Sequence, residues 1–167
     1  LTGPDGPTHH GCFDIAYLRC LPNFVVMAPG DAWDVAPMLE FALRQECPVS
    51  LRYPKTNAAK AATAAADRQP IELGKSEVLR TGRDGAILCL GTLLNDCLKA
   101  ADLLGAEGLD VGVVNARFAK PIDREIIERL LRESSFVVTV EEGCLMGGFG
   151  SAVLEAASEL GLDTGRI

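Results

Sequence analysis

The sequence predicts an α/β protein in which largely parallel sheets are flanked by helices. The first observation is the regular alternation of strand and helix signals after residue 75, because strands joined by helices pair in parallel. The second is the short apolar run at 24–28, which ends in a Pro-Gly pair and is typical of a buried parallel strand. The third is an alanine-rich stretch between these regions, which divides the chain into two units.

The first unit is expected to alternate between helix and strand. Its predicted elements are a helix at 12–18, a strand at 24–28, a helix at 32–45 and a strand at 48–53. Asp31 is a good N-cap for the second helix, which carries an apolar stripe. Pro37 lies inside that helix, so the helix either kinks there or begins closer to Asp34.

Composition changes after the second strand. Residues 58–66 are nearly all alanine and carry no apolar stripe, so we predict a surface linker at 57–71. The expected domains are then 1–56 and 72–167. In the second domain the predicted strands are 75–80, 85–90, 109–114 and 135–140, and the predicted helices are 92–104, 121–132 and 149–160, with Pro121 at the first position of its helix.

Composition and charge exclude several classes of function. Hydrophobic residues make up 48% of the 167 positions and charged residues 23%, which is enough to build a buried core. The net charge of −7 repels nucleic acid and anionic lipid. No apolar run approaches the roughly 20 residues that a membrane-spanning helix needs. We therefore expect neither a nucleic-acid nor a membrane partner.

The six cysteines do not predict a metal site. None belongs to a Cys-x-x-Cys pair, and only two histidines are present, so the spacing of a zinc site is missing. Most of the cysteines lie in apolar runs, which favours buried free thiols in a reducing compartment over disulfides.

The first candidate site is the Gly/Pro-rich loop at 5–11, which carries an acid and both histidines. Histidine exchanges a proton near neutral pH, and a nearby carboxylate can orient it. Asp5, His9 and His10 are therefore candidates for proton transfer. The alternative is a capped turn whose histidines are merely exposed.

The second candidate site follows the predicted strand at 48–53. Arg52, Tyr53 and Lys55 lie where the strand ends, and ligands of open α/β sheets gather outside the carboxyl ends of strands. Arg52 and Lys55 suit a phosphate or a carboxylate. The alternative is a solvated strand end.

A third segment, the glycine-rich run at 141–151, is interpreted as structural. Glycines between a strand and a helix can cradle a phosphate, but this run lacks the Gly-Lys-Ser/Thr of a P-loop. Glu141 and Glu142 would also repel an anion. We expect the glycines to allow close packing or positive φ angles.

In their order and spacing these segments resemble the 1-deoxy-D-xylulose 5-phosphate synthases, a family of transketolase-like enzymes that depend on thiamine diphosphate. No single motif is specific, but the likeness covers nearly the whole chain. The matching segments are 5–11, 13–22, 27–29, 52–54 with Asn57, 91–92, 117–123, 140–143 and 146–151.

The resemblance implies that 1–56 is the tail of a pyrimidine-binding domain and that 72–167 is a C-terminal domain truncated at its end. Both ends of the chain are interpreted as cuts through a larger protein. The family joins pyruvate to glyceraldehyde 3-phosphate with loss of carbon dioxide, using thiamine diphosphate and Mg²⁺. The resemblance further implies that the whole protein is a homodimer in the bacterial cytoplasm or in a plastid.

The resemblance also implies roles for individual residues. His9 would lie beside the thiazolium, stabilise oxyanions and carry protons, while Asp5 would position the hydroxyl groups of the acceptor. Lys55 aligns with an arginine that holds the acceptor phosphate, and lysine keeps the charge but loses the two-pronged geometry. Arg52 is a further candidate for substrate binding, and His10 has no assigned catalytic role.

The carboxylate that activates the aminopyrimidine lies upstream in this family, as do the metal and diphosphate ligands. We therefore expect the isolated chain neither to bind thiamine diphosphate and Mg²⁺ tightly nor to turn over. The alternatives are another transketolase-like enzyme, such as a transketolase or the β subunit of a 2-oxoacid dehydrogenase, and a non-catalytic folding and dimer-contact module.

Overall fold

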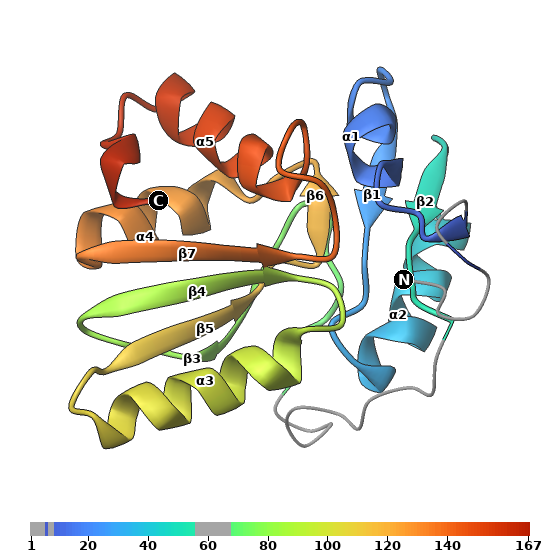
Figure 1. The fold of residues 1–167 in the computed structure, drawn as a ribbon. Helices are drawn as coiled ribbons and strands as arrows, with labels where there is room; N and C mark the ends of the chain where they lie inside the picture. The colour runs from blue at the N-terminus through green and yellow to red at the C-terminus, as the bar shows by residue number, and fades with distance from the viewer. Residues whose placement is uncertain (1–5, 7–8, 56–67) are drawn as a thin grey trace.

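Two sheets with helices packed against them make up the protein, as the computed structural model of residue 6 and residues 9–55 and 68–167 shows (Figure 1). The larger sheet has the strand order β3-β5-β4-β7. Its strands are β3 (Glu77–Arg80), β4 (Gly85–Leu90), β5 (Val111–Asn115) and β7 (Phe136–Glu141). The central β4 pairs in parallel with β5 and β7, and only β3 at the edge is antiparallel. The predicted largely parallel sheet is confirmed.

Three helices cover the two faces of this sheet, namely α3 (Leu94–Ala106), α4 (Arg124–Glu133) and α5 (Phe149–Glu159). In Figure 1, α3 lies on one face and α4 and α5 lie on the other. The buried strand β4 supplies side chains to both faces because its residues alternate. Ile87 and Cys89 pack in the cluster that contains α3, whereas Leu88 and Leu90 pack in the cluster that contains α4 and α5.

The smaller sheet has the order β2-β1-β6 and draws on both units of the chain. Its strands are β1 (Val25–Met27), β2 (Val49–Leu51) and β6 (Phe118–Lys120), with β1 parallel to β2 and antiparallel to β6. The sequence did not predict β6. Because a strand of the second unit completes the sheet of the first, the two units share one framework.

The helices α1 (Asp14–Arg19) and α2 (Ala32–Leu43) flank this smaller sheet. Val25 and Met27 of β1 pack in the cluster with α2, whereas Val26 packs in the main core with Ile15 of α1. That main core also contains residues of α4 and α5, so it runs without a break from one unit to the other.

Two predicted helix starts are resolved by their caps. Asp31 caps α2 as expected, accepting hydrogen bonds from the amides of Trp33 (3.0 Å) and Asp34 (3.4 Å). The helix begins at Ala32 with Pro37 inside it, so the later start is wrong. The prediction of a helix from Pro121 is also wrong, because Asp123 is the N-cap and α4 begins three residues later than predicted, at Arg124.

Other predictions fall on the connecting segments. Residues 57–67 of the predicted linker at 57–71 lie outside the described residues, and within its described part Arg68 is buried and not on the surface. All six cysteines are free, as expected, yet only Cys89 and Cys97 are buried, because the others lie in loops or at element ends. The chain ends in a short 3-10 helix, Thr164–Arg166. None of the described helices is long and apolar enough to span a membrane.

Candidate active site

The carboxyl ends of parallel strands from both sheets converge on one region. Figure 1 shows β4 and β7 pointing toward the smaller sheet, where β1 and β2 run parallel to each other. The residues that follow these strands, Arg52 after β2, Thr92 after β4 and Glu142 after β7, are linked by polar contacts. This edge is where ligands of open α/β sheets bind, so the convergence marks the candidate site.

Arg52 is the centre of these contacts. Its Nε lies 2.8 Å from Oδ2 of Asp14, the first residue of α1. Its Nη2 donates to the carbonyl oxygen of Gly11 at 3.2 Å and also to the carbonyl oxygen of Glu142. The Glu142 carboxylate accepts a hydrogen bond of 2.9 Å from the Thr92 hydroxyl and lies 4.0 Å from Nη1 of Arg52. A single guanidinium therefore joins three segments: the loop at 5–11 that carries both histidines, called here the histidine loop, and the ends of β2 and β7.

The histidine loop leads directly to this guanidinium. His9 is exposed, and its amide donates to the carbonyl oxygen of Gly6 at 3.1 Å. His10 is half-buried, and its Nδ1 is a buried atom without a hydrogen-bond partner. Gly11 has a φ of +61° and holds the loop to Arg52 through its carbonyl oxygen. Asp5, the predicted acceptor-binding acid, lies outside the described residues.

Lys55 lies three residues after Arg52 and is exposed. The backbone of Arg52 is fixed because its amide donates to the carbonyl oxygen of Met27, the last residue of β1, at 2.9 Å. The contact between Arg52 and Gly11 thus places the histidine loop beside the strand end that leads to Lys55. The two predicted candidate sites are parts of one region, although the catalytic and substrate-binding roles of their residues stay predictions.

The glycine-rich run before α5 packs against protein groups. Arg19 donates to the carbonyl oxygens of Gly147 at 2.7 Å and Gly148 at 2.9 Å. The amide of Gly150 donates to Oε1 of Glu141 at 3.0 Å, so a carboxylate occupies the N-terminal end of α5. A Cβ on Gly148 would lie 2.2 Å from the carbonyl oxygen of Cys144. These contacts support the structural interpretation of the run.

A buried ionic cluster, which sequence reasoning missed, joins the two units. Arg68 lies 2.7 Å from Asp31, 3.1 Å from Asp34 and 2.9 Å from Glu77, and Arg117 lies 3.3 Å from Asp34 and 2.9 Å from Glu77. Three carboxylates thus face two guanidiniums, almost wholly removed from water. The only sequence signal was the match of 117–123 to a family motif.

The surroundings of this cluster explain its electrostatics. The guanidinium carbons of Arg68 and Arg117 lie 4.7 Å and 5.8 Å from the centre of the Trp33 ring. Asp34 accepts hydrogen bonds from Gly30 N at 2.9 Å and Asn115 Nδ2 at 2.8 Å. Burial raises the pKa of Asp34 above its usual range, although Arg117 and these hydrogen bonds act in the opposite direction.

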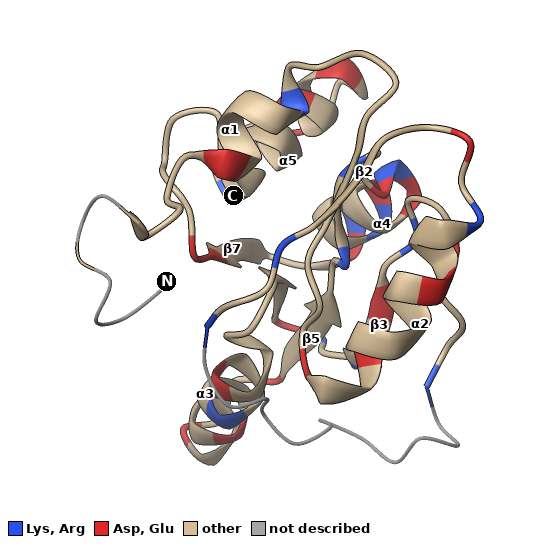
Figure 2. Cartoon of the chain, turned by 90° about the vertical axis from the view of Figure 1, so that its right-hand side faces the viewer, with Lys and Arg blue, Asp and Glu red and all other residues tan. Residues whose placement is uncertain are grey.

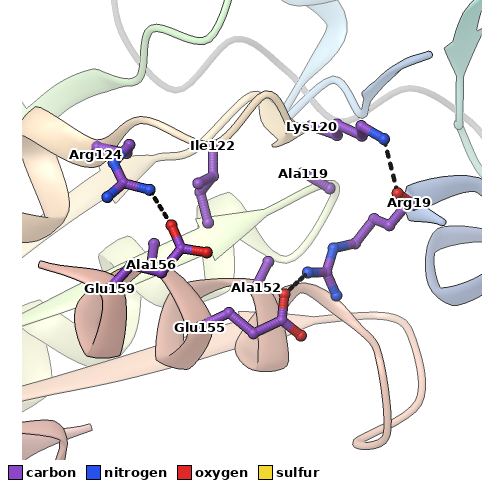
Figure 3. Close-up of a pocket in the computed structure, with 9 residues that line it drawn as sticks. All are labelled: Arg19, Ala119, Lys120, Ile122, Arg124, Ala152, Glu155, Ala156 and Glu159. Atoms are coloured by element: carbon purple, nitrogen blue, oxygen red, sulfur yellow. Dashed lines mark hydrogen bonds and ion pairs between the residues drawn. The ribbon is translucent and has the colours of Figure 1, made fainter. Parts of the chain in front are cut away.

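A pocket of about 190 Å³ lies between the end of α1, β6, α4 and α5 (Figure 3). Its cations already have partners, because Arg19 pairs with Glu155, Arg124 pairs with Glu159, and Lys120 donates to backbone carbonyls. Both signs of charge are likewise mixed along α4, which borders the pocket, and along α3 elsewhere in the protein, as Figure 2 shows. The pocket therefore offers an anion no uncommitted cation. It is lined by Arg19, Ala119, Lys120, Ile122, Arg124, Ala152, Glu155, Ala156 and Glu159.

The fit of a cofactor can be judged from the residues present. The exposed His9 ring and the orphaned Nδ1 of His10 suit the edge of a polar ligand site. Across residue 6 and residues 9–55 and 68–167, no group of three or more His, Cys, Asp or Glu residues is placed to hold a metal ion.

Comparison with known proteins identifies two domain families in the chain. The transketolase C-terminal domain matches residues 74–165, and the transketolase pyrimidine binding domain matches residues 1–60. The 1-deoxy-D-xylulose-5-phosphate synthase of Rhodopirellula baltica is 51% identical over 167 residues, which are 100% of this chain and 26% of that protein. The protein of the same name from Gloeobacter violaceus is 49% identical over 163 residues, 97% of this chain and 26% of that protein.

Two solved structures share the fold. A split gene transketolase, described as an inactive beta4 tetramer, matches with a TM-score of 0.82 and 37% identity over 89% of this chain and 48% of that chain. A transketolase from Campylobacter jejuni matches with a TM-score of 0.70 and 24% identity over 83% of this chain and 22% of that chain. The chain thus spans about a quarter of the curated relatives quoted above. The predicted α/β fold and family resemblance are confirmed.

Proposed function

The chain belongs to the transketolase family, and from that premise we propose that it is part of a 1-deoxy-D-xylulose-5-phosphate synthase. The observation that carries the proposal is the match, at about half identity, with two enzymes of that name over all or nearly all of the chain. The proposed reaction joins pyruvate to glyceraldehyde 3-phosphate and releases carbon dioxide. Its product feeds the synthesis of isoprenoid, thiamine and pyridoxal precursors.

The proposed role of His9 is proton transfer. Thiamine diphosphate, when bound, supplies a nucleophilic carbon and an electron sink. The oxygen of the pyruvate ketone would gain negative charge in such a reaction, and the imidazole N–H of His9 would donate a hydrogen bond to that oxygen, transfer its proton to it and later take a proton back. The exposed position of His9, at the edge where the strands of both sheets end, supports this role.

The proposed acceptor site lies beside it. The ammonium group of Lys55 would bind the phosphate of glyceraldehyde 3-phosphate, as a point charge and not as a two-pronged donor. Asp5 would accept hydrogen bonds from the acceptor hydroxyl groups. Arg52 was predicted to contact substrate as well, and its guanidinium is engaged with Asp14, Gly11 and Glu142.

The remaining parts of the enzyme are proposed to come from outside this chain. They are the contacts to Mg²⁺ and to the diphosphate, and the carboxylate that activates the aminopyrimidine. On this view the isolated chain is inactive and binds the cofactor weakly at most. The whole protein would be a homodimer in the cytoplasm of a bacterium or in a plastid.

Carbon dioxide release by the full-length protein tests the proposal. With pyruvate, thiamine diphosphate and Mg²⁺ present, release should depend on glyceraldehyde 3-phosphate. It should fall about 100-fold or more in His9→Ala and persist in the control variant Arg44→Gln, which changes an exposed arginine at the end of α2. Ketol transfer from a sugar phosphate without carbon dioxide release would instead assign the protein to the transketolases.

A second candidate concerns the isolated chain. The solved relative described as an inactive beta4 tetramer matches 89% of this chain, which favours a folding and assembly module without catalysis. Gel filtration of the 167-residue chain separates the two states it could adopt. A monodisperse oligomer would support the module, whereas aggregates would contradict it.

A further inference from the structure

We propose that Arg52 is a positioning residue, which holds the histidine loop at a fixed place between β2 and the C-terminal unit. The inference rests on the proposed function, because it assigns how the same site is assembled. Arg52 contacts Asp14, Gly11 and Glu142 at the same time.

Arg52 contacts its partners through nitrogens on different sides of the guanidinium. The Nε edge meets the Asp14 carboxylate at 2.8 Å, and Nη2 meets the carbonyl oxygens of Gly11 and Glu142. A planar fork with donors on several sides can satisfy these partners at once, whereas a lysine has a single nitrogen to share. The side-chain chemistry at position 52 therefore fixes the distances among three separate segments.

Burial makes these contacts strong enough to position a loop. The side chains of Arg52, Asp14 and Glu142 are 13%, 20% and 15% exposed, so water screens their charges only partly. Removing the guanidinium would leave two carboxylates half-buried without their shared cation, and Asp14 Oδ1 already has no hydrogen-bond partner. The N-terminal end of α1 and the loop before it would then shift or become more mobile.

The consequence for the site follows from chain connectivity. His9 lies two residues before Gly11, and Lys55 lies three residues after Arg52. The bond from Arg52 to the Gly11 carbonyl oxygen therefore sets the spacing between the proton-transfer residue and the phosphate-binding residue. The contact with Glu142 brings the C-terminal unit into the same arrangement, which gives that unit a part in catalysis without any contact to substrate.

Two acceptors distinguish positioning from direct substrate contact in the full-length enzyme. We expect Arg52→Gln to lower kcat/KM by about 10- to 100-fold with glyceraldehyde 3-phosphate and equally with D-glyceraldehyde, which has no phosphate. The loss should lie in kcat, with the KM for either acceptor changed by less than about twofold. The comparison variant Lys55→Met should lose activity only with the phosphorylated acceptor. A loss in Arg52→Gln confined to the phosphorylated acceptor would overturn the proposal.

Coupling to Asp14 provides an independent check. If the two residues act through one contact, Asp14→Asn added to Arg52→Gln should cost less than about a further twofold in kcat/KM. Arg52→Lys should recover part of the loss, because it keeps the charge near Asp14. Additive losses from the two changes would contradict a shared role. Arg44→Gln, an exposed arginine at the end of α2, is the matched control and should behave like wild type.

Hydrogen exchange separates this inference from the proposed function. In the full-length protein, Arg52→Gln should speed amide exchange in residues 9–19 and 142–151, and Lys55→Met should leave both segments unchanged. This result would support the positioning role even if the wild-type protein showed no reaction with pyruvate, which would defeat only the proposed function. Unchanged exchange in both segments would overturn the positioning role itself.

Discussion

Two arginine clusters join the same two units of this protein, yet they differ in how far water reaches them. The side chain of Arg68 is 0% exposed and is surrounded by carboxylates of Asp31, Asp34 and Glu77. The side chain of Arg52 is 13% exposed, and its partners include the carbonyl oxygens of two loops. The first cluster joins the start of α2 to β3, and the second joins the start of α1 to the loops at Gly11 and Glu142.

The difference indicates a division of roles. A dry cluster of paired charges is costly to break, because the partner left behind stays buried and unpaired. A partly solvated cluster loses less free energy when broken, because water can replace the missing partner. We therefore expect changes at Arg68 to act on stability and changes at Arg52 to act on the arrangement of the candidate site.

The largest expected effect comes from removing Arg68. Arg68→Met should lower the free energy of unfolding by about 3–5 kcal/mol, because three buried carboxylates would each lose an ion pair and Arg117 would remain for two of them, Asp34 and Glu77. Urea unfolding of the 167-residue chain, followed by the fluorescence of Trp33, its single tryptophan, measures this directly. Arg44→Met is the exposed control, and a loss below about 1 kcal/mol in Arg68→Met would show that the cluster is not critical.

Alanine substitutions at two glycines, one beside the Arg68 cluster and one beside Arg52, should differ less in their effect on stability. A Cβ on Gly30, beside the dry cluster, would lie 2.6 Å from Leu94 Cδ2 and 2.9 Å from Asn115 Nδ2. Gly30→Ala should therefore cost about 1–3 kcal/mol through overpacking. Gly11, with a φ of +61°, has no atom within 4 Å of such a Cβ, so Gly11→Ala should cost only about 1 kcal/mol of backbone strain. The same unfolding measurement compares them, and equal losses would contradict the contrast.

The pH dependence of stability offers a third contrast. Burial raises the pKa of Asp34 in the folded protein, so the folded state binds a proton more tightly than the unfolded chain does. Its ionised form therefore lowers stability above the folded pKa, and that cost disappears as the pH falls toward the ordinary aspartate value of about 3.9.

The variant Asp34→Asn isolates this effect. The stability of wild type minus that of the variant should increase as the pH is lowered through the folded pKa of Asp34, and unfolding curves from pH 7 to pH 4 test the sign. The exposed Asp102→Asn should show no such trend. A difference that falls with decreasing pH would mean that the pKa of Asp34 is lowered instead.

The smallest effect is expected at the pocket of Figure 3. Arg124 and Glu159 pair across it with side chains 46% and 65% exposed, so solvent screens their attraction. Glu159→Gln should change the free energy of unfolding by less than about 1 kcal/mol, and less still at high salt. A larger decrease in the urea midpoint of Glu159→Gln would mean that this exposed ion pair stabilises the fold more than a solvent-screened pair should.

Local sequence patterns predicted the elements whose own residues carry the signal, such as an apolar run or an N-cap. β4 is an apolar run with both faces covered, and Asp31 caps α2 through its own following amides. β6 escaped prediction because its strand character comes from pairing with β1, where Val26 lies opposite Lys120 and Met27 opposite Phe118. Pairing between distant segments leaves no periodic signal in three residues.

The candidate site was predictable only in part for the same reason. His9, Lys55 and Arg52 stood out because their residue types suit proton transfer and anion binding at strand ends. The contacts of Arg52 could not be predicted, because Glu142 is 90 positions away and becomes a neighbour only when the two sheets meet. The arginine at 68 was hidden still further by the alanine-rich stretch before it.

The most direct test compares turnover per folded molecule in Arg52→Gln and Arg68→Met, measured in the full-length protein with pyruvate and glyceraldehyde 3-phosphate. We predict that Arg52→Gln stays folded and loses about 10- to 100-fold in turnover. Arg68→Met should leave fewer molecules folded, while the molecules that remain folded turn over within about twofold of wild type. Equal losses of turnover per folded molecule in both variants would contradict the division between a stabilising and a positioning cluster.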